Sequence, residues 1–308
     1  MPSLRRVSIA PMMGRTDRHF RYFLRLISRH AWLYTEMVVV PALLRGDRKR
    51  LLDFDPTEHP LALQLGGSDP ATLAECARMA EQWGYDEINL NIGCPSNRVT
   101  AGRFGACLMA DPDLVARCVE AMRRAVSTPI TVKHRIGIDD MDRYEDLSRF
   151  VRIVASGGCE VFIIHARKAW LQGISPRKNR SVPPLRHEFS HAIKRDFPHV
   201  EIVTNGGIDN LDSVAMHLGT LDGVMIGRAA YEDPYLLAGV DQRFYGDTTP
   251  PLSRPEVWER LIPYIERQIA GGGIASRITR HLFGLYRGLP GARAWRQRLS
   301  SEVGRRAI

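Results

Sequence analysis

The stretch Glu87-Ile88-Asn89-Leu90-Asn91-Ile92-Gly93-Cys94-Pro95-Ser96 decides how the rest of the chain is interpreted. Apolar residues alternate with Glu87, Asn89 and Asn91, which is the period of a β-strand, and glycine, cysteine and proline then end the strand. A strand that carries polar groups on one face and stops at a thiol is poorly suited to packing alone. The pattern therefore predicts a strand that leads into an active site.

Seven further apolar runs, bounded by turn residues, accompany this strand along the first three quarters of the chain. The eight predicted strands cover 7–10, 32–37, 61–65, 87–92, 130–135, 161–166, 202–205 and 223–227. Helix-like stretches such as 71–83 and 113–126 separate most of them, and each of these two follows an aspartate and a proline. Eight strands alternating with helices predict an α/β fold, a (β/α)8 TIM barrel. A doubly wound open sheet is the alternative, disfavoured because no GxGxxG follows the first strand.

The last fifth of the chain has a different, helical pattern. Ser253 opens a capping box with Glu256, and an apolar stripe then predicts a helix to about 270, kinked or broken at Pro263. Two more helices are predicted at about 275–287 and 292–303. The sequence thus predicts a catalytic barrel at 1–240, a linker at 241–251 and a small C-terminal helical domain at 252–308.

Composition excludes several classes of protein. No apolar stretch approaches the roughly 20 residues that span a bilayer, and the N-terminus lacks the apolar core of a signal peptide. An odd number of cysteines without CxxC spacing argues against a disulfide framework or a zinc site; the five are Cys76, Cys94, Cys107, Cys118 and Cys159. The prediction is a cytoplasmic protein without metal and without membrane contact, with a monomer as the default state.

The net charge of +9 is concentrated near the C-terminal end. Residues 254–308 contain 11 arginines, no lysine and 4 glutamates, so this segment carries +7 and the rest of the chain only +2. An arginine-rich region on a nearly neutral body indicates a polyanionic partner. A solvated helical face is the alternative interpretation, and high-GC codon usage would also favour arginine over lysine.

Polar residues at strand ends suggest what the barrel mouth holds, because catalytic groups of such barrels lie at the carboxyl ends of the strands. Four would converge there from four strands: Gln64, Asn91, Lys133 and His165. The turns Asn205-Gly206-Gly207 and Gly227-Arg228 are typical of phosphate-binding loops, since glycine lets the backbone approach an anion. A phosphorylated ligand beside Lys133 suggests a flavin, because a cation stabilises its anionic reduced form.

Cys94 is the candidate proton donor. Reducing an activated C=C bond requires a hydride at one carbon and a proton at the other, and an unperturbed thiol, with a pKa of about 8.5, is mostly protonated at neutral pH. As a nucleophile the thiol would instead need a base partner. Cys107 is the rival thiol, although its small apolar neighbours favour a packing role.

Together these residues resemble the tRNA-dihydrouridine synthases, flavoenzymes that reduce a uridine base in tRNA. The similar segments keep their order over roughly residues 5–235; they are 10–21, 89–96, 102–109, 131–133, 164–167, 204–207 and 227–228. The segment 170–180, followed by 183–185, resembles the A branch of the bacterial enzymes, which modifies D-loop uridines at tRNA positions 20 and 20a.

The resemblance implies a role for particular residues. Cys94 would be the general acid, and Asn91 would lie near the target uracil. FMN contacts would come from Pro11, Met12, Met13, Gln64, Lys133, His165, Asn205, Gly206, Gly207, Gly227 and Arg228. Further tRNA contacts are expected from one loop and one helix face, namely Arg177, Lys178, Arg180, Arg293 and Arg296.

The predicted function is FMN-dependent reduction of uridine to 5,6-dihydrouridine in the tRNA D-loop, with NADPH as reductant. The first alternative is a small-molecule FMN oxidoreductase of dihydroorotate-dehydrogenase type, which leaves the arginine-rich end without a role. A non-catalytic RNA-binding protein is the second alternative, and a phosphate-binding aldolase or isomerase barrel is a distant third. The sequence leaves open which of positions 20 and 20a is modified, and whether NADPH or NADH is preferred.

Overall fold

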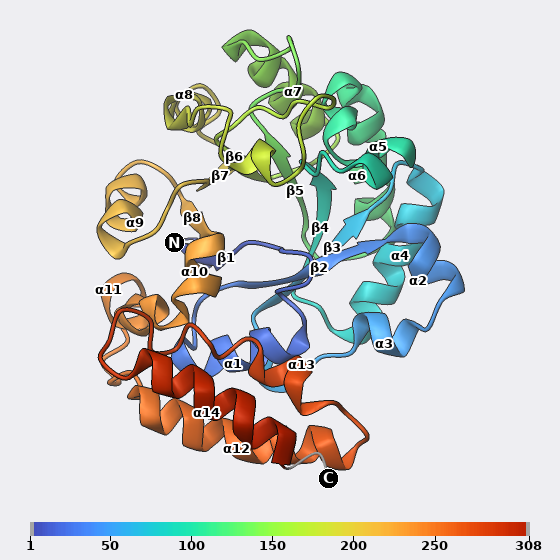
Figure 1. Ribbon diagram of the computed structural model, residues 1–308. Coiled ribbons are helices and arrows are strands. Elements are labelled where there is room, and N and C mark those ends of the chain that lie inside the picture. The colour runs from blue at the N-terminus through green and yellow to red at the C-terminus, as the bar shows by residue number, and fades with distance from the viewer. Residues whose placement is uncertain (1–2, 306–308) are drawn as a thin grey trace.

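The core of the molecule is one sheet of eight parallel strands, with helices around it (Figure 1). The computed structural model describes residues 3–305. The strands, in the order β1-β8-β7-β6-β5-β4-β3-β2, are β1 (Val7–Ile9), β2 (Leu33–Val39), β3 (Leu61–Gly66), β4 (Glu87–Ile92), β5 (Ile130–Arg135), β6 (Val161–His165), β7 (Glu201–Asn205) and β8 (Gly223–Ile226). Trp32, just before β2, closes the ring: its N–H donates to Val7 and its carbonyl accepts from Ile9, both at 2.9 Å. The predicted (β/α)8 barrel is confirmed.

The helices cover the outside of the barrel and continue beyond it. They are α1 (Arg18–Ile27), α2 (Val40–Arg45), α3 (Arg48–Leu52), α4 (Pro70–Trp83), α5 (Asn97–Ala101), α6 (Pro112–Ala125), α7 (Tyr144–Ser156), α8 (His187–Asp196), α9 (Leu211–Leu218), α10 (Arg228–Glu232), α11 (Val240–Tyr245), α12 (Arg254–Ala270), α13 (Ala275–Thr279) and α14 (Ala292–Arg305). Short 3-10 turns complete the chain at η1 (Pro56–Glu58), η2 (Gly105–Ala110), η3 (Lys178–Arg180) and η4 (Pro234–Gly239). None of the helices within residues 3–305 combines the length and apolar character needed to cross a membrane.

Helix starts follow the chemistry that the sequence predicts. The Asp69 carboxylate accepts from the Thr72 N–H at the start of α4, and Asp111 accepts from the Leu114 N–H at the start of α6. A proline occupies the first turn of both helices, where a missing N–H costs nothing. Ser253 and Glu256 form the predicted capping box of α12.

The first C-terminal helix reaches its predicted end, whereas the second is shorter than predicted. α12 continues past Pro263 to Ala270, held by buried residues that pack on α1, where Tyr264 stacks on Tyr22 with ring centroids 3.9 Å apart. The helix predicted over 275–287 is wrong beyond Thr279, and turns follow as far as residue 291. Gly284 explains part of this difference: it lies against the Glu232 carbonyl, where a Cβ would come within 2.6 Å.

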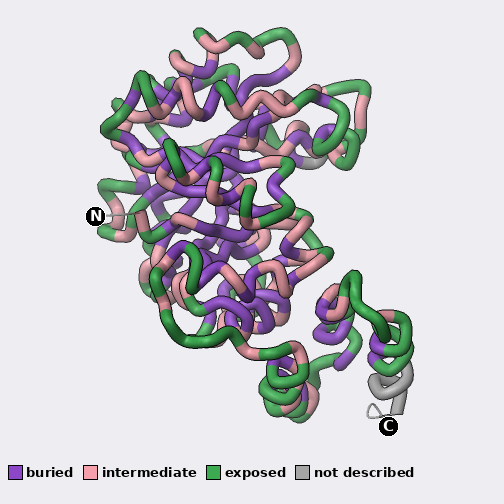
Figure 2. The backbone as a smooth tube through the Cα atoms, turned by 90° about the vertical axis from the view of Figure 1, so that its left-hand side faces the viewer, coloured by how far each residue is buried: buried purple, intermediate pink, exposed green. Residues whose placement is uncertain are grey.

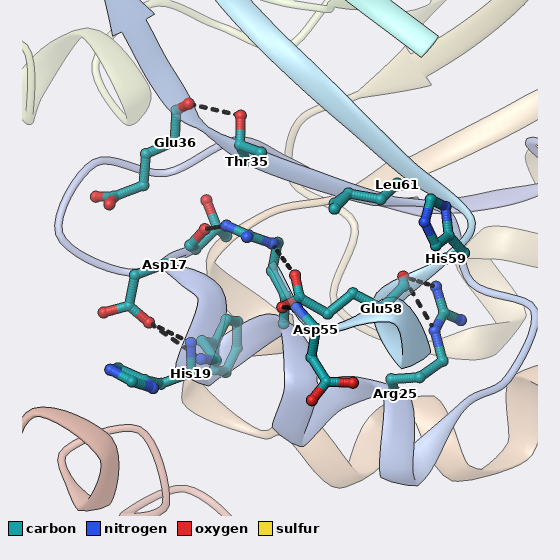
Figure 3. Close-up of polar contacts among 12 residues, drawn as sticks. Asp17, His19, Arg25, Thr35, Glu36, Asp55, Glu58, His59 and Leu61 are labelled. Atoms are coloured by element: carbon teal, nitrogen blue, oxygen red, sulfur yellow. Dashed lines mark hydrogen bonds and ion pairs between the residues drawn. The ribbon is translucent and has the colours of Figure 1, made fainter. Parts of the chain in front are cut away.

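Buried charge ties α1 to the turn before β3 (Figure 3). The Arg21 guanidinium pairs with the Glu58 carboxylate at 2.6 Å, and both side chains are almost fully buried. Arg25, one turn later, donates to the Glu58 carbonyl oxygen at 2.9 Å. These bonds fix how α1 lies against the loop that leads into β3.

The C-terminal helices lie beside α1 at one edge of the barrel (Figure 1), and their outward surface is largely exposed, whereas the barrel interior is buried (Figure 2). Asp17, at the start of α1, forms an ion pair with Arg280 at 2.6 Å, just after α13. α11 begins one residue before the segment predicted as a linker and otherwise lies within it. The domain boundaries at 240 and 252 stay a prediction.

Candidate active site

A cavity of about 520 Å³ lies at the carboxyl ends of the strands, a size typical of small-molecule sites. The four polar strand residues predicted to converge all line it, namely Gln64, Asn91, Lys133 and His165. Cys94 and the glycines after β7 and β8 line the same cavity. The residues thought to carry proton transfer and ligand binding therefore share one site.

The predicted contacts divide into those at the cavity and those away from it. Every residue of the predicted flavin set lines the cavity: Pro11, Met12, Met13, Gln64, Lys133, His165, Asn205, Gly206, Gly207, Gly227 and Arg228. Asn91 and Arg180 line it too, whereas the neighbouring Arg177 and Lys178 do not. Arg293 and Arg296 are exposed on α14, outside the cavity lining.

The turn that carries Cys94 is held from three sides. Asn91 Oδ1 accepts from the backbone N–H groups of Gly93 and Cys94, at 3.1 and 2.9 Å. Arg135 Nε donates to the Gly93 carbonyl at 2.9 Å, and the Ala106 N–H donates to the Cys94 carbonyl at 3.0 Å. A short loop fixed in this way presents its thiol in one position.

Gly105 lets the chain return close to this turn. Its φ is +74°, and a Cβ there would meet the Cys94 carbonyl oxygen at 2.7 Å. The following Cys107 donates its thiol to the Phe104 carbonyl at 3.2 Å and is absent from the cavity lining. Burial raises the pKa of Cys107. Of the two rival thiols, only Cys94 faces the cavity.

Two basic side chains at the cavity have lowered pKa values, so they lose their proton more readily than usual. Burial, helped by repulsion from Arg135, lowers the pKa of Lys133 to about 7. Burial also lowers the pKa of His165 well below its ordinary range, with Arg135 and Lys133 adding to the effect. Lys133 Nζ donates to Asn205 Oδ1 at 3.1 Å. An anion or a strong hydrogen-bond acceptor in the cavity would favour the charged form of both groups.

The loop after β7 is shaped by its glycines. Gly206 and Gly207 have φ of +115° and +70°, which disfavours any other residue. A Cβ on Gly206 would approach the His165 ring at 2.8 Å, and one on Gly207 would approach Leu185 at 2.4 Å. Both positions therefore need glycine, and both line the cavity; their phosphate-binding role stays a prediction.

Sequence reasoning did not assign Arg135, which is buried at the centre of the site. Besides the Gly93 carbonyl, its guanidinium donates to the carbonyls of Lys168 and Asn179, both at 3.0 Å. Burial lowers the pKa of Arg135 to about 10. The sequence did place Arg135 on the same strand face as Lys133, which is the feature that could have indicated its role at the cavity. Arg15 also lines the cavity without having been predicted.

A separate polar cluster lies at the end of α1. Atoms of His30, Asp241 and Asp247 that could bind a metal lie within 4.8 Å of one another. These groups already have protein partners, since Asp241 accepts from Ser28 Oγ and Asp247 pairs with Arg29. The cluster therefore joins α11 to the end of α1, and absence of a metal stays a prediction.

Comparison with known proteins identifies the family of the chain. The family model described as dihydrouridine synthase (Dus) matches residues 8–306. The tRNA-dihydrouridine(20/20a) synthase of Synechocystis sp. is 58% identical over 301 residues, covering 98% of this chain and 90% of its own. Enzymes of the same name from Pseudomonas aeruginosa and Shewanella oneidensis are 58% and 57% identical over 299 residues, covering 97% of this chain and 90% and 89% of their own. The chain belongs to the dihydrouridine synthase family.

Proposed function

We propose that this protein reduces uridine to 5,6-dihydrouridine in the D-loop of tRNA, at position 20, position 20a or both, with FMN as cofactor and NADPH as reductant. The observation that supports it best is that one cavity combines Cys94, the polar strand residues and both glycine loops. Similarity to synthases named for positions 20/20a, over 97–98% of this chain, supports the choice of substrate.

The residues at the cavity fit a phosphorylated flavin, the cofactor class on which the family depends. Gly206 and Gly207 line the cavity, where their backbone N–H groups would bind a phosphate, and Arg228 in the same lining adds positive charge. Lys133, which is partly buried at the cavity and donates to Asn205, suits the electron-rich edge of a flavin ring. When bound, the flavin supplies the hydride that the reduction requires.

The protein's own part in the reaction is to hold the base and deliver a proton. Cys94 Sγ would give its proton to C5 of the uracil while the hydride reaches C6. Hydrogen bonds to the turn at Gly93 and Cys94 keep the thiol in one position. A fixed position contributes to the rate because the proton donor is already oriented toward the base. Asn91, at the edge of the same turn, is proposed to bind the uracil.

The target uridine is stacked inside the folded tRNA and must be drawn out to reach the cavity. Unstacking costs a few kcal/mol, which contacts to the RNA backbone can offset. The arginines of the C-terminal helices are proposed to make those contacts, together with Arg177, Lys178 and Arg180. A cytoplasmic location and a monomeric state remain predictions.

Anaerobic stopped-flow measurement tests the proposal. The reduced holoenzyme is mixed with unmodified transcribed tRNA, and the flavin absorbance is followed. We expect reoxidation by tRNA and none by free uracil or orotate. Reoxidation by orotate but not by tRNA would support the dihydroorotate-dehydrogenase type of enzyme instead. A colourless protein that still binds tRNA would leave only the non-catalytic alternative.

A further inference from the structure

A continuous line of buried polar side chains runs through the inside of the barrel and ends at the cavity. In order, it consists of Glu87, Thr131, Asn89, Gln64 and Asn91. All are buried, and the middle three lie in one layer, since Gln64 pairs with Asn89 and Asn89 with Thr131 in the strand register. Neither proton delivery nor flavin binding explains a carboxylate and a hydroxyl so deep in the barrel.

The direction of these hydrogen bonds is fixed from the cavity end. Backbone N–H groups can only donate, and those of Gly93 and Cys94 both donate to Asn91 Oδ1. Asn91 Nδ2 must then donate to Gln64 Oε1, at 2.8 Å. Gln64 Nε2 in turn donates to Asn89 Oδ1, also at 2.8 Å.

The opposite end of the line imposes the same direction. The Glu87 carboxylate only accepts, and Thr131 Oγ1 donates to it at 2.6 Å. Thr131 Oγ1 is thereby left to accept from Asn89 Nδ2, at 2.8 Å. Arg5 and the Tyr34 hydroxyl also donate to Glu87. Burial, and Glu87 beside it, raise the pKa of Tyr34 well above its usual range, so this hydroxyl keeps its proton.

We propose that Glu87 and Thr131 are positioning residues that act through this line to hold the Cys94 turn and to offer amide hydrogens to the substrate. The substrate half of this inference rests on the proposed function. Among the described residues the second Asn91 N–H has no acceptor, so it is left to the cavity that Asn91 lines. A donor there matches a carbonyl of uracil and opposes the amino group that cytosine carries.

Thr131→Val tests the line because it removes the hydroxyl at nearly constant volume. Asn89 Nδ2 then loses its acceptor, so the amides of Asn89, Gln64 and Asn91 are held less firmly and the turn at Gly93 and Cys94 loosens. In the flavin-free protein we expect iodoacetamide to alkylate Cys94 roughly fivefold faster, the effect of losing about one hydrogen bond. The Cys107 peptide in the same digest is the internal reference.

In the holoenzyme, Thr131→Val should lower kcat with tRNA by about tenfold or more while KM and flavin content change little, because orientation is lost. Thr131→Ser keeps the hydroxyl and should restore both readouts. Ser8→Ala removes another buried strand hydroxyl, which donates to the Val224 carbonyl and lies outside the polar line, and should change neither.

If Thr131→Val and Thr131→Ser lowered kcat equally, the proposal would be overturned. An unchanged rate of Cys94 alkylation in a folded Thr131→Val protein would also overturn it. If Thr131→Val does not fold, Asn89→Leu breaks the same line from β4 and is subject to the same criteria. The alkylation measurement needs neither flavin nor tRNA, so failure of the proposed function would not affect it.

Discussion

At the scale of single residues, two thiols lie near one another in sequence but only one of them lines the cavity. Cys94 sits on a turn held by Asn91 and Arg135, whereas Cys107 bonds to a backbone carbonyl. We predict that Cys94→Ala retains flavin but slows reoxidation by tRNA by about 10²–10⁴-fold, the usual contribution of a general acid. Cys107→Ala is the matched control and should stay within about twofold of the parent rate. Full turnover in Cys94→Ala would assign the proton to another group.

Lys133 gives a pH prediction at the same scale. Because burial lowers the pKa of Lys133 to about 7 in the free protein, much of it is neutral above that pH. If binding FMN favours the charged ammonium, binding takes up a proton, and affinity should fall by up to about tenfold for each pH unit above 7. Titration of the flavin-free protein with FMN between pH 6 and 9 measures the slope. Lys133→Met should bind more weakly with little slope above pH 7; an unchanged slope would place the titrating group elsewhere.

At the scale of elements, strands were predictable because their apolar, β-branched runs are local in sequence, and helices α4 and α6 because aspartate and proline mark their starts. The turns after α13 were not, and one contact within them, between Gly284 and the Glu232 carbonyl, joins positions 52 residues apart. Arg135 escaped assignment because the Asn179 carbonyl it binds lies 44 residues away. Strand alternation placed the cavity residues on one face. The direction of the hydrogen bonds along that face was not predictable, because it depends on contacts between different strands.

Arg25 supports a prediction about how elements are joined. Its buried guanidinium donates to carbonyl oxygens in two loops, those of Ser28, Arg29, Ala31, Glu58 and Pro60. Arg25→Met removes these bonds, and although the Pro60 carbonyl keeps the Leu33 N–H as a donor, we expect the free energy of unfolding to fall by about 3–5 kcal/mol in urea titration. Arg25→Lys keeps the charge but cannot span both loops and should lose roughly half as much. A lysine variant as stable as the parent would show that charge, not the planar fork, joins these loops.

At the scale of the whole molecule, Asp17 links the barrel to the C-terminal helices. Its carboxylate caps α1 and also pairs with Arg280 and His281. Burial alone would raise the pKa of Asp17, but the bonds to His281, Phe20 and Arg280 hold it well below its usual range. The stabilisation is therefore present above the unfolded-state value of about 4 and is lost as the pH falls below it.

Two substitutions at Asp17 separate its roles. Asn keeps the helix cap but removes the charge, so Asp17→Asn should lower the free energy of unfolding at pH 7 by about 1–2 kcal/mol and flatten its decline below pH 4. Asp17→Ala also loses the cap and should cost about 1 kcal/mol more. Urea unfolding at pH 3, 5 and 7 provides the comparison. If Asp17→Asn declined as steeply in acid as the parent, another carboxylate would control this transition.

The uneven charge of the chain leads to a prediction about tRNA binding. Exposed Arg293 and Arg296 lie three residues apart on α14, so both can meet phosphates from one helix face. Each phosphate contact adds about one unit to the slope of log affinity against log salt concentration. The Arg293→Ala/Arg296→Ala protein should therefore bind tRNA more weakly at low salt, with a slope smaller by about two. Arg124→Ala is the control: this exposed arginine of α6 pairs with Glu120, and its loss should leave the slope unchanged. If the double variant kept the parent's slope while Arg177→Ala/Lys178→Ala lowered it, the RNA backbone would be held at the barrel mouth alone, and the arginine-rich helices would serve another partner.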